Sequence, residues 1–165
     1  MADSTASTDA GGRQITMERT YSASAQDIWD LWTTREGIES WWAPDGFSVE
    51  VRELDLRPGG RLLYAMTAVT PDMIEFMNRA GMPVSTEARK TFTEVVARER
   101  LAYLSLADFI PGVEPYEFAT VVELEAGSQG VRLAMTVEPM HDDVWTGRLV
   151  KGRENELDNL ARLIG

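Results

Sequence analysis

The sequence contains no cysteine and only one histidine, His141, among its 165 residues. The lack of cysteine excludes disulfide bonds, thiolate catalysis and cysteine-ligated zinc sites, and it is typical of a reducing compartment. No stretch approaches the roughly 18 consecutive apolar residues that a membrane-spanning helix needs. The N-terminus, MADSTASTDAGG, also lacks the apolar stretch of a secretory signal. These absences favour a soluble, cytoplasmic protein.

Positively charged residues are also fewer than negatively charged ones. The chain has 16 Lys and Arg residues against 27 Asp and Glu residues, which gives a formal net charge of −11. Such a surface repels the phosphates of nucleic acids and the headgroups of anionic membranes, so we expect neither as a partner. No G-x-S-x-G, Walker or G-x-G-x-x-G motif is present. The sequence therefore predicts no cofactor, no metal site and no catalytic residue.

The composition is that of one globular domain. Residues 1–12 are small and polar and are predicted to form a flexible tail. Residues 13–165 contain no linker, repeat or low-complexity break, so they are predicted to form a single domain. A chain of this length buries about 70% of the surface that its unfolded form exposes, which leaves room for a core and an internal pocket.

Alternation of apolar and polar residues predicts a mostly β structure. Residues 13–21 alternate as a first strand, and further strands are predicted at residues 47–56, 61–69, 87–97, 100–107, 116–126 and 131–139. The RPGG sequence at 57–60 has the pattern of a type II turn, so the strands predicted at 47–56 and 61–69 are expected to form a hairpin. Consecutive strands of this kind form an antiparallel sheet with one dry face.

Four helices are predicted around these strands. Ser24 is placed as an N-cap before a helix with an apolar face, and a second short helix, at residues 35–42, ends near Trp42. Thr70 is the expected N-cap of a third helix, which stops at Gly81. The last helix, at residues 142–164, carries an apolar stripe and is the natural cover for the dry face of the sheet; the stripe consists of Trp145, Leu149, Leu157, Leu160 and Ile164.

Two turn motifs lie close together, WWAPDGF at residues 41–47 and DLRPGGR at residues 55–61. These two motifs, at this spacing, are part of a wider resemblance: the chain resembles the activator of heat-shock protein 90 ATPase homologue-like family of the START-like (SRPBCC) superfamily. The resemblance extends over roughly residues 15–165, and its other segments are SASAQDIWDLWTT, EVRELDLRPGGRLLY, FTEVVARERLAYL, GVRLAMTVEPM and GRENELDNLARLIG.

The resemblance implies an α+β helix-grip fold. In this fold, a curved antiparallel sheet of six to seven strands wraps around a long C-terminal helix and encloses a cavity. Trp41 and Trp42 would then lie near one mouth of the groove, although at least one of them could simply fill the core.

Two features depart from the family pattern. Family members often have Gly-Trp in the last helix, where this chain has Gly152 and Arg153. Arg153 lies on the inward stripe, so it either extends its charged end to the rim, which is the more ordinary case, or meets a buried carboxylate or an anionic ligand. The insert at residues 70–89 is longer than usual. It would form a flexible, methionine-rich lid over the cavity or a plain packed helix.

An apolar groove with a few tyrosine hydroxyls is the usual composition of a small-molecule site. The residues predicted to line it are Trp42, Tyr64, Met66, Phe76, Met77, Tyr103, Tyr116, Phe118, His141, Trp145, Leu149 and Arg153. The alternative is that these side chains only pack against the helix. A general-base or metal role for His141 is weaker, because Asp142 and Asp143 beside it are expected helix caps. Glu114 and Glu117 could form an acid–base pair, but carboxylates near a loop are usually solvated.

Three functions remain open. The favoured one is the binding of a small hydrophobic or amphipathic molecule in the cavity. The second is a chaperone-associated role, as the family name implies, although the chain has no room for the extra N-terminal domain of full-length activators. The third is a cyclase-, dehydratase- or hydrolase-like activity on the same fold, which the fold alone does not establish. A homodimer is possible, and the sequence does not decide it.

Overall fold

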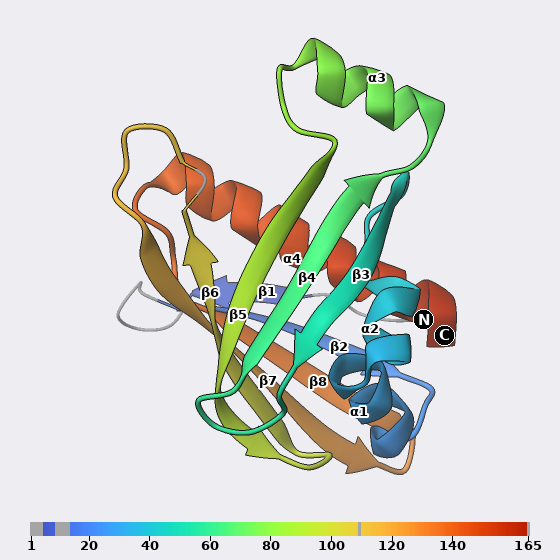
Figure 1. Ribbon diagram of the computed structural model, residues 1–165. Coiled ribbons are helices and arrows are strands. Elements are labelled where there is room, and N and C mark those ends of the chain that lie inside the picture. Colours follow the sequence, from blue (N-terminus) through green and yellow to red (C-terminus); the bar gives the residue numbers. More distant parts are fainter. Residues whose placement is uncertain (1–4, 9–13, 109, 165) are drawn as a thin grey trace.

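The computed structural model describes residues 5–8, 14–108 and 110–164. These residues form one antiparallel sheet and four helices (Figure 1). In chain order, the elements are β1 (Thr5–Thr8), β2 (Ile15–Tyr21), α1 (Ala25–Thr33), α2 (Arg35–Trp41), β3 (Phe47–Leu54), β4 (Arg61–Ala68), α3 (Pro71–Arg79), β5 (Ser85–Val96), β6 (Arg100–Ala107), β7 (Tyr116–Gly127), β8 (Gly130–Val137) and α4 (Asp143–Ile164).

The sheet has the order β1-β2-β8-β7-β6-β5-β4-β3. Strands β3 to β8 form a meander, and β2 pairs with β8. The register shifts between Val51 and Glu53 on β3 and between Phe92 and Glu94 on β5, and bulges of this kind bend a sheet. Helix α4 runs diagonally across the concave side (Figure 1). The prediction of a helix-grip fold is therefore confirmed.

Strand β1 is an addition to the predicted sheet. The seven strands expected from the sequence are present, and β1 pairs with β2 to make an eighth, with Thr5 opposite Glu18 and Thr8 opposite Ile15. β1 falls within the stretch that was predicted to be a flexible tail. The rest of that stretch, residues 1–4 and 9–12, lies outside the described residues.

The predicted helix caps are confirmed. The Ser24 hydroxyl accepts a hydrogen bond from the backbone N–H of Asp27 at 3.0 Å, and Thr70 accepts one from Met73 at 3.4 Å. Each bond satisfies an N–H that has no partner within its own helix. Gly81 follows α3 with a φ of +69°, which suits glycine at the end of a helix.

The paired tryptophans belong to the core. Trp41 and Trp42 are 4% and 3% exposed, and together with Trp32 from α1 they form an aromatic cluster. The ring centroids lie 4.7 Å apart for Trp32 and Trp41 and 5.3 Å apart for Trp41 and Trp42. The indole N–H of Trp41 donates to the carbonyl of Leu31 at 2.7 Å. Thus α1 and α2 are fixed to each other, and Trp42 lies over the Tyr64 ring of β4, 6.0 Å away between centroids.

Helix α4 is bound to the sheet by its inward residues. Leu157 and Leu160 are fully buried, as the apolar stripe predicts. The Tyr21 hydroxyl of β2 donates to the carbonyl of Leu157 at 2.9 Å, within the core. The buried Arg19 of β2 forms an ion pair with Asp158 at 2.6 Å. These contacts set the height of α4 above the sheet and so the space beneath it.

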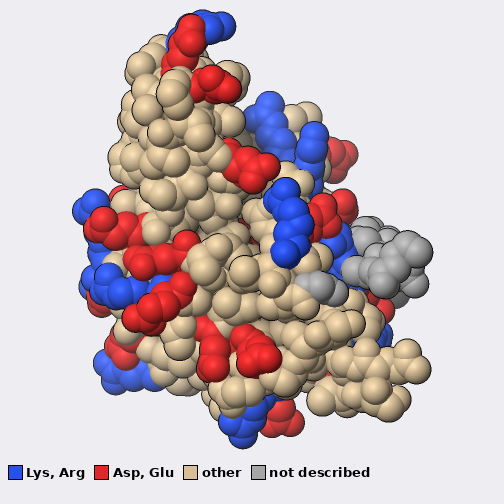
Figure 2. Space-filling view, turned by 90° about the vertical axis from the view of Figure 1, so that its right-hand side faces the viewer, with Lys and Arg blue, Asp and Glu red and all other residues tan. Residues whose placement is uncertain are grey.

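Helix α3 projects beyond the end of the sheet (Figure 1). Phe76 and Met82 are 57% and 45% exposed, whereas Met77 is buried. In the space-filling view, charged side chains occupy the tip of this projection and uncharged surface lies beneath it (Figure 2). The insert therefore contains a helix with one packed residue and an exposed apolar side.

The β7–β8 turn offers a test of backbone fit. Gly130 has a φ of +120°, and a Cβ atom there would lie 2.2 Å from the carbonyl oxygen of Tyr21. Gly130→Ala is expected to lower the free energy of unfolding by at least about 1 kcal/mol. The control is Gly147→Ala in α4, where no atom lies within 4 Å of the added Cβ. It should raise stability by about 0.5–1 kcal/mol. Urea unfolding measures both, and equal effects would contradict this account of the turn.

Candidate functional site

A pocket of about 300 Å³ lies between α4, the end of α2 and strand β4. We call it the α4 pocket, and its lining residues are Trp42, Pro44, Met66, Leu149, Gly152, Arg153, Asn155, Glu156 and Asn159. Four of these, Trp42, Met66, Leu149 and Arg153, are among the predicted cavity residues. The other five were missed. Trp42 at the end of α2, Met66 of β4 and Leu149 of α4 supply the aromatic and aliphatic part of the lining, and the polar part comes from α4.

Arg153 lies at the base of the α4 pocket and is only 6% exposed. Its Nη1 atom lies 3.0 Å from Oε1 and 3.3 Å from Oε2 of Glu156, one helical turn further on. Its Nη2 atom donates to the hydroxyl of Thr120 on β7 at 3.3 Å. Of the alternatives that the sequence left open, Arg153 therefore meets a carboxylate, and the more ordinary one, extension to the rim, is wrong. Its buried Nε has no hydrogen-bond partner among the described residues.

Two tyrosines form the layer beneath the pocket. Tyr64 of β4 and Tyr103 of β6 are 5% and 1% exposed. Burial raises the pKa of Tyr103 to about 12; the charge of Arg153 acts in the opposite direction and that of Glu156 in the same direction. The Tyr103 hydroxyl and the Trp32 indole N–H are buried without a hydrogen-bond partner among the described residues. The core below the pocket therefore contains polar atoms whose bonding capacity is unused.

The buried lysine of β5, Lys90, was not predicted. It is 6% exposed, and its Nζ donates to the hydroxyl of Ser105 on β6 at 2.9 Å. The same Nζ lies 5.1 Å from the ring centroid of Tyr103, 5.9 Å from Trp42 and 6.0 Å from Tyr64. The pKa of Lys90 is lowered to about 7, mainly by burial and also by the charge of Arg153, while Glu156 acts in the opposite direction. An amine in this setting is uncharged in a large fraction of molecules near neutral pH.

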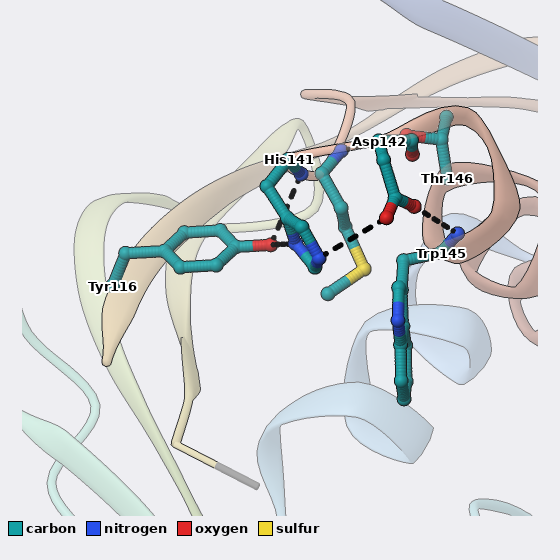
Figure 3. Close-up of polar contacts among 6 residues, drawn as sticks. Tyr116, His141, Asp142, Trp145 and Thr146 are labelled. Atoms are coloured by element: carbon teal, nitrogen blue, oxygen red, sulfur yellow. Dashed lines mark hydrogen bonds and ion pairs between the residues drawn. The ribbon is translucent and has the colours of Figure 1, made fainter. Parts of the chain in front are cut away.

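A second group of predicted residues lies at the start of α4 (Figure 3). The Tyr116 hydroxyl is 2.9 Å from Nδ1 of His141, and Nε2 of His141 is 3.4 Å from Asp142. Asp142 accepts a hydrogen bond from the backbone N–H of Trp145 at 2.8 Å, as an N-cap does. These contacts attach β7 to the helix start. They favour the capping role that was expected for Asp142.

The remaining predicted cavity residues lie in two places. Phe118 belongs to a small apolar cluster with Ala107 and Ile110, and Tyr116 and Trp145 pack against it. Phe76 and Met77 lie on α3, where Phe76 is exposed and Met77 is buried. None of these side chains lines the α4 pocket. The sequence analysis assigned these residues to one cavity. The fold instead distributes them over three regions: the α4 pocket and the core next to it, the start of α4, and α3.

A larger hollow, of about 620 Å³, lies away from the core and has a charged lining. Arg132 pairs there with Glu18 at 2.5 Å, and Arg100 pairs with Glu123 at 2.8 Å. Because these charges satisfy one another on an open surface, the hollow lacks the enclosed apolar wall of a ligand site. Among the described residues, no three His, Asp or Glu side chains are placed to hold a metal ion. No helix in the described part of the chain is long and apolar enough to cross a membrane.

A sheet curved around one long C-terminal helix, with a pocket between them, defines the helix-grip class of START-like domains. The family model described as "Activator of Hsp90 ATPase homolog 1-like protein" matches residues 22–165, so the chain belongs to that family. A comparison with the curated proteins finds no match.

Solved structures share the fold. A protein of Chromobacterium violaceum superposes with a TM-score of 0.74 at 24% sequence identity, over 92% of this chain and 96% of that one. A protein of Mycobacterium smegmatis gives 0.72 at 20% identity, over 98% and 97% of the two chains. The AHSA1-like protein from Aeromonas hydrophila gives 0.70 at 21% identity, over 90% of each chain. At these identities the likeness establishes the architecture and leaves the ligand to the site itself.

Proposed function

We propose that the protein binds a small amphipathic molecule in the α4 pocket. The observation that carries the proposal is the pairing of an apolar wall, made by Trp42, Met66 and Leu149, with a buried cation, Arg153, at its base. Small-molecule sites commonly combine such walls with a few fixed polar groups. As part of the same proposal, we place the protein in the cytoplasm. The sequence contains no cysteine, as is typical of a reducing compartment, and no helix in the described part of the chain could cross a membrane.

Two glycines of α4 provide a direct test. Gly152 lines the pocket and Gly147 does not, and a side chain added at either position meets no atom within 4 Å at its Cβ. The probe is the uncharged fluorescent dye phenylnaphthylamine. Gly152→Phe should fill the pocket and weaken dye binding by at least about tenfold, a loss of about 1.4 kcal/mol. Gly147→Phe should leave the affinity unchanged. Equal affinities for the two variants would refute the proposed pocket.

Stabilisation by the dye gives a second readout. A ligand that binds only the folded state, at a hundred times its dissociation constant, should raise the free energy of unfolding by about 2.7 kcal/mol. Wild-type protein and Gly147→Phe should gain this stability, and Gly152→Phe should not. A gain in all three proteins would place the dye elsewhere.

A chaperone-associated role is the second candidate, because the family description names an activator of Hsp90 ATPase. The exposed apolar side chains Val69, Phe76 and Met82 around α3 would supply a contact surface. In an ATPase assay with the chaperone, the wild-type protein should then change the rate and Phe76→Ser should reduce that change. An unaltered rate with wild-type protein would reject this candidate.

A further inference from the structure

The interior beneath the α4 pocket holds more positive groups than negative ones. Arg153 forms an ion pair with Glu156, and the two therefore balance. Lys90 has no ion pair among the described residues, and its amine is bonded only to the Ser105 hydroxyl and ringed by aromatic side chains. With Lys90 protonated, the group would carry one unbalanced positive charge away from water. Such a charge is costly unless an anion meets it.

The choice of lysine at this position is informative. The chain uses 14 arginines and only two lysines, Lys90 and Lys151, of which Lys151 is exposed. Arginine stays charged in proteins, whereas a buried lysine can release its proton. Without a nearby anion, Lys90 can therefore balance the local charge by being neutral. The Lys90 amine can therefore be neutral or protonated in the folded protein, and a bound anion would favour the protonated form.

The described side chains around Lys90 include no free carboxylate that could balance its charge. The rings of Tyr64 from β4 and Tyr103 from β6 lie 6.0 and 5.1 Å from its Nζ, and the charges of Arg153 and Glu156 on α4 act on its pKa in opposite directions. Both tyrosines have pKa values raised mainly by burial, so they are neutral and can donate hydrogen bonds. The one carboxylate among these groups is already engaged by Arg153. The buried atoms without a hydrogen-bond partner among the described residues include Nε of Arg153, which can only donate, and the hydroxyl of Tyr103, which can donate or accept.

From this geometry we infer that the amphipathic ligand carries a single negative charge, that its anionic group lies against Arg153 in the lining of the α4 pocket, and that Lys90, whose amine lies 5.9 Å from the ring centroid of the pocket residue Trp42, takes up a proton as the anion binds. The apolar part of the ligand then lies along Met66 and Leu149. The inference rests on the proposed function and adds the ligand's chemical class and the residue that selects it. The only bond that forms is an N–H bond at Nζ of Lys90, and its proton comes from the solvent or its buffer.

Two dyes of nearly the same shape test the inference. Anilinonaphthalene sulfonate is the anionic probe, and phenylnaphthylamine is its uncharged parent. Lys90→Met should weaken binding of the anionic dye by about tenfold or more, because the positive charge that the bound anion induces at Lys90 is lost, and should change binding of the uncharged dye by less than about twofold. Lys151→Met should alter neither affinity. Gly152→Phe should weaken both, which confirms that both dyes occupy the α4 pocket.

Calorimetric titration in buffers of different ionisation enthalpy measures the proton. At about pH 8, where Lys90 is mostly neutral, wild-type protein should take up close to one proton per anionic dye and none with the uncharged dye. Lys90→Arg, which is charged throughout, should retain binding of the anionic dye without proton uptake. This second variant keeps the test valid if Lys90→Met does not fold.

The possible results separate the two proposals. If the uncharged dye binds in the α4 pocket but the anionic dye shows no dependence on Lys90, the inference about ligand charge is wrong and the pocket stands. The inference is also wrong if anion binding takes up no proton. If neither dye responds to Gly152→Phe, the proposed function fails, and the inference fails with it.

Discussion

Glu156→Gln is expected to lower the free energy of unfolding by about 3–5 kcal/mol, because it leaves a buried cation without its counter-charge. Arg153 is 6% exposed, and both oxygens of Glu156 lie within 3.3 Å of its Nη1 atom. The Thr120 hydroxyl is its only other hydrogen-bond partner among the described residues, and a neutral hydroxyl does not replace a carboxylate. Urea unfolding monitored by circular dichroism gives the loss.

Two further variants separate burial from charge. Glu75→Gln removes the partner of Arg79 on α3, where both side chains are largely exposed, and should cost less than about 1 kcal/mol. The double variant Arg153→Met with Glu156→Gln removes the stranded charge and should recover most of the lost stability. If Glu156→Gln and Glu75→Gln lower the free energy of unfolding by similarly small amounts, Arg153 is solvated and the account of a buried ion pair is wrong.

Lys90→Met is expected to stabilise the protein at pH 7, on the order of 2–4 kcal/mol, and to change its pH dependence. The pKa of Lys90 is lowered in the folded state to about 7, chiefly by burial, whereas a lysine in an unfolded chain titrates near pH 10.4. Between these values the unfolded state binds more protons than the folded state. The destabilisation by Lys90 is therefore complete below about pH 7 and disappears as the pH approaches 10.

Unfolding of wild-type and Lys90→Met proteins between pH 6 and pH 10 tests this expectation. The stability difference should be largest at the acidic end and should shrink steadily with increasing pH. Lys151→Met, on the exposed side of α4, should match the wild type throughout. A difference that stays constant with pH, or a less stable Lys90→Met protein, would show that Lys90 remains charged and satisfied in the folded state.

The order of elements could be read from the sequence because local chemistry determines most of it. The caps at Ser24 and Thr70 and the alternation of β3 and β4 agree with the structure within a few residues. Strand β1 was not predictable in this way. Its residues, TAST, are small and polar, and its pairing with β2 depends on a partner strand rather than on an apolar pattern.

The site was only partly predictable. Arg153 could be placed inward from the helical stripe, and Glu156, at i+3, was readable as its partner by spacing alone. Lys90 has the parity of Phe92 on β5, which points it inward, but a lysine at such a position is ordinarily expected at an edge or in solvent. Its burial depends on Trp42, Tyr64 and Tyr103, which come from three other parts of the fold.

The methionine methyl groups allow one measurement of where the ligand binds. The chain has eight methionines, among them Met66 in the α4 pocket, Met77 and Met82 in the α3 region, and Met140, which directly precedes His141 at the start of α4. In a methyl NMR titration with phenylnaphthylamine, we expect the Met66 signal to shift and to show contacts with the dye, while Met82 and Met140 stay unchanged. Shifts at Met82 or Met140 with an unchanged Met66 signal would contradict the assignment of the α4 pocket as the binding site.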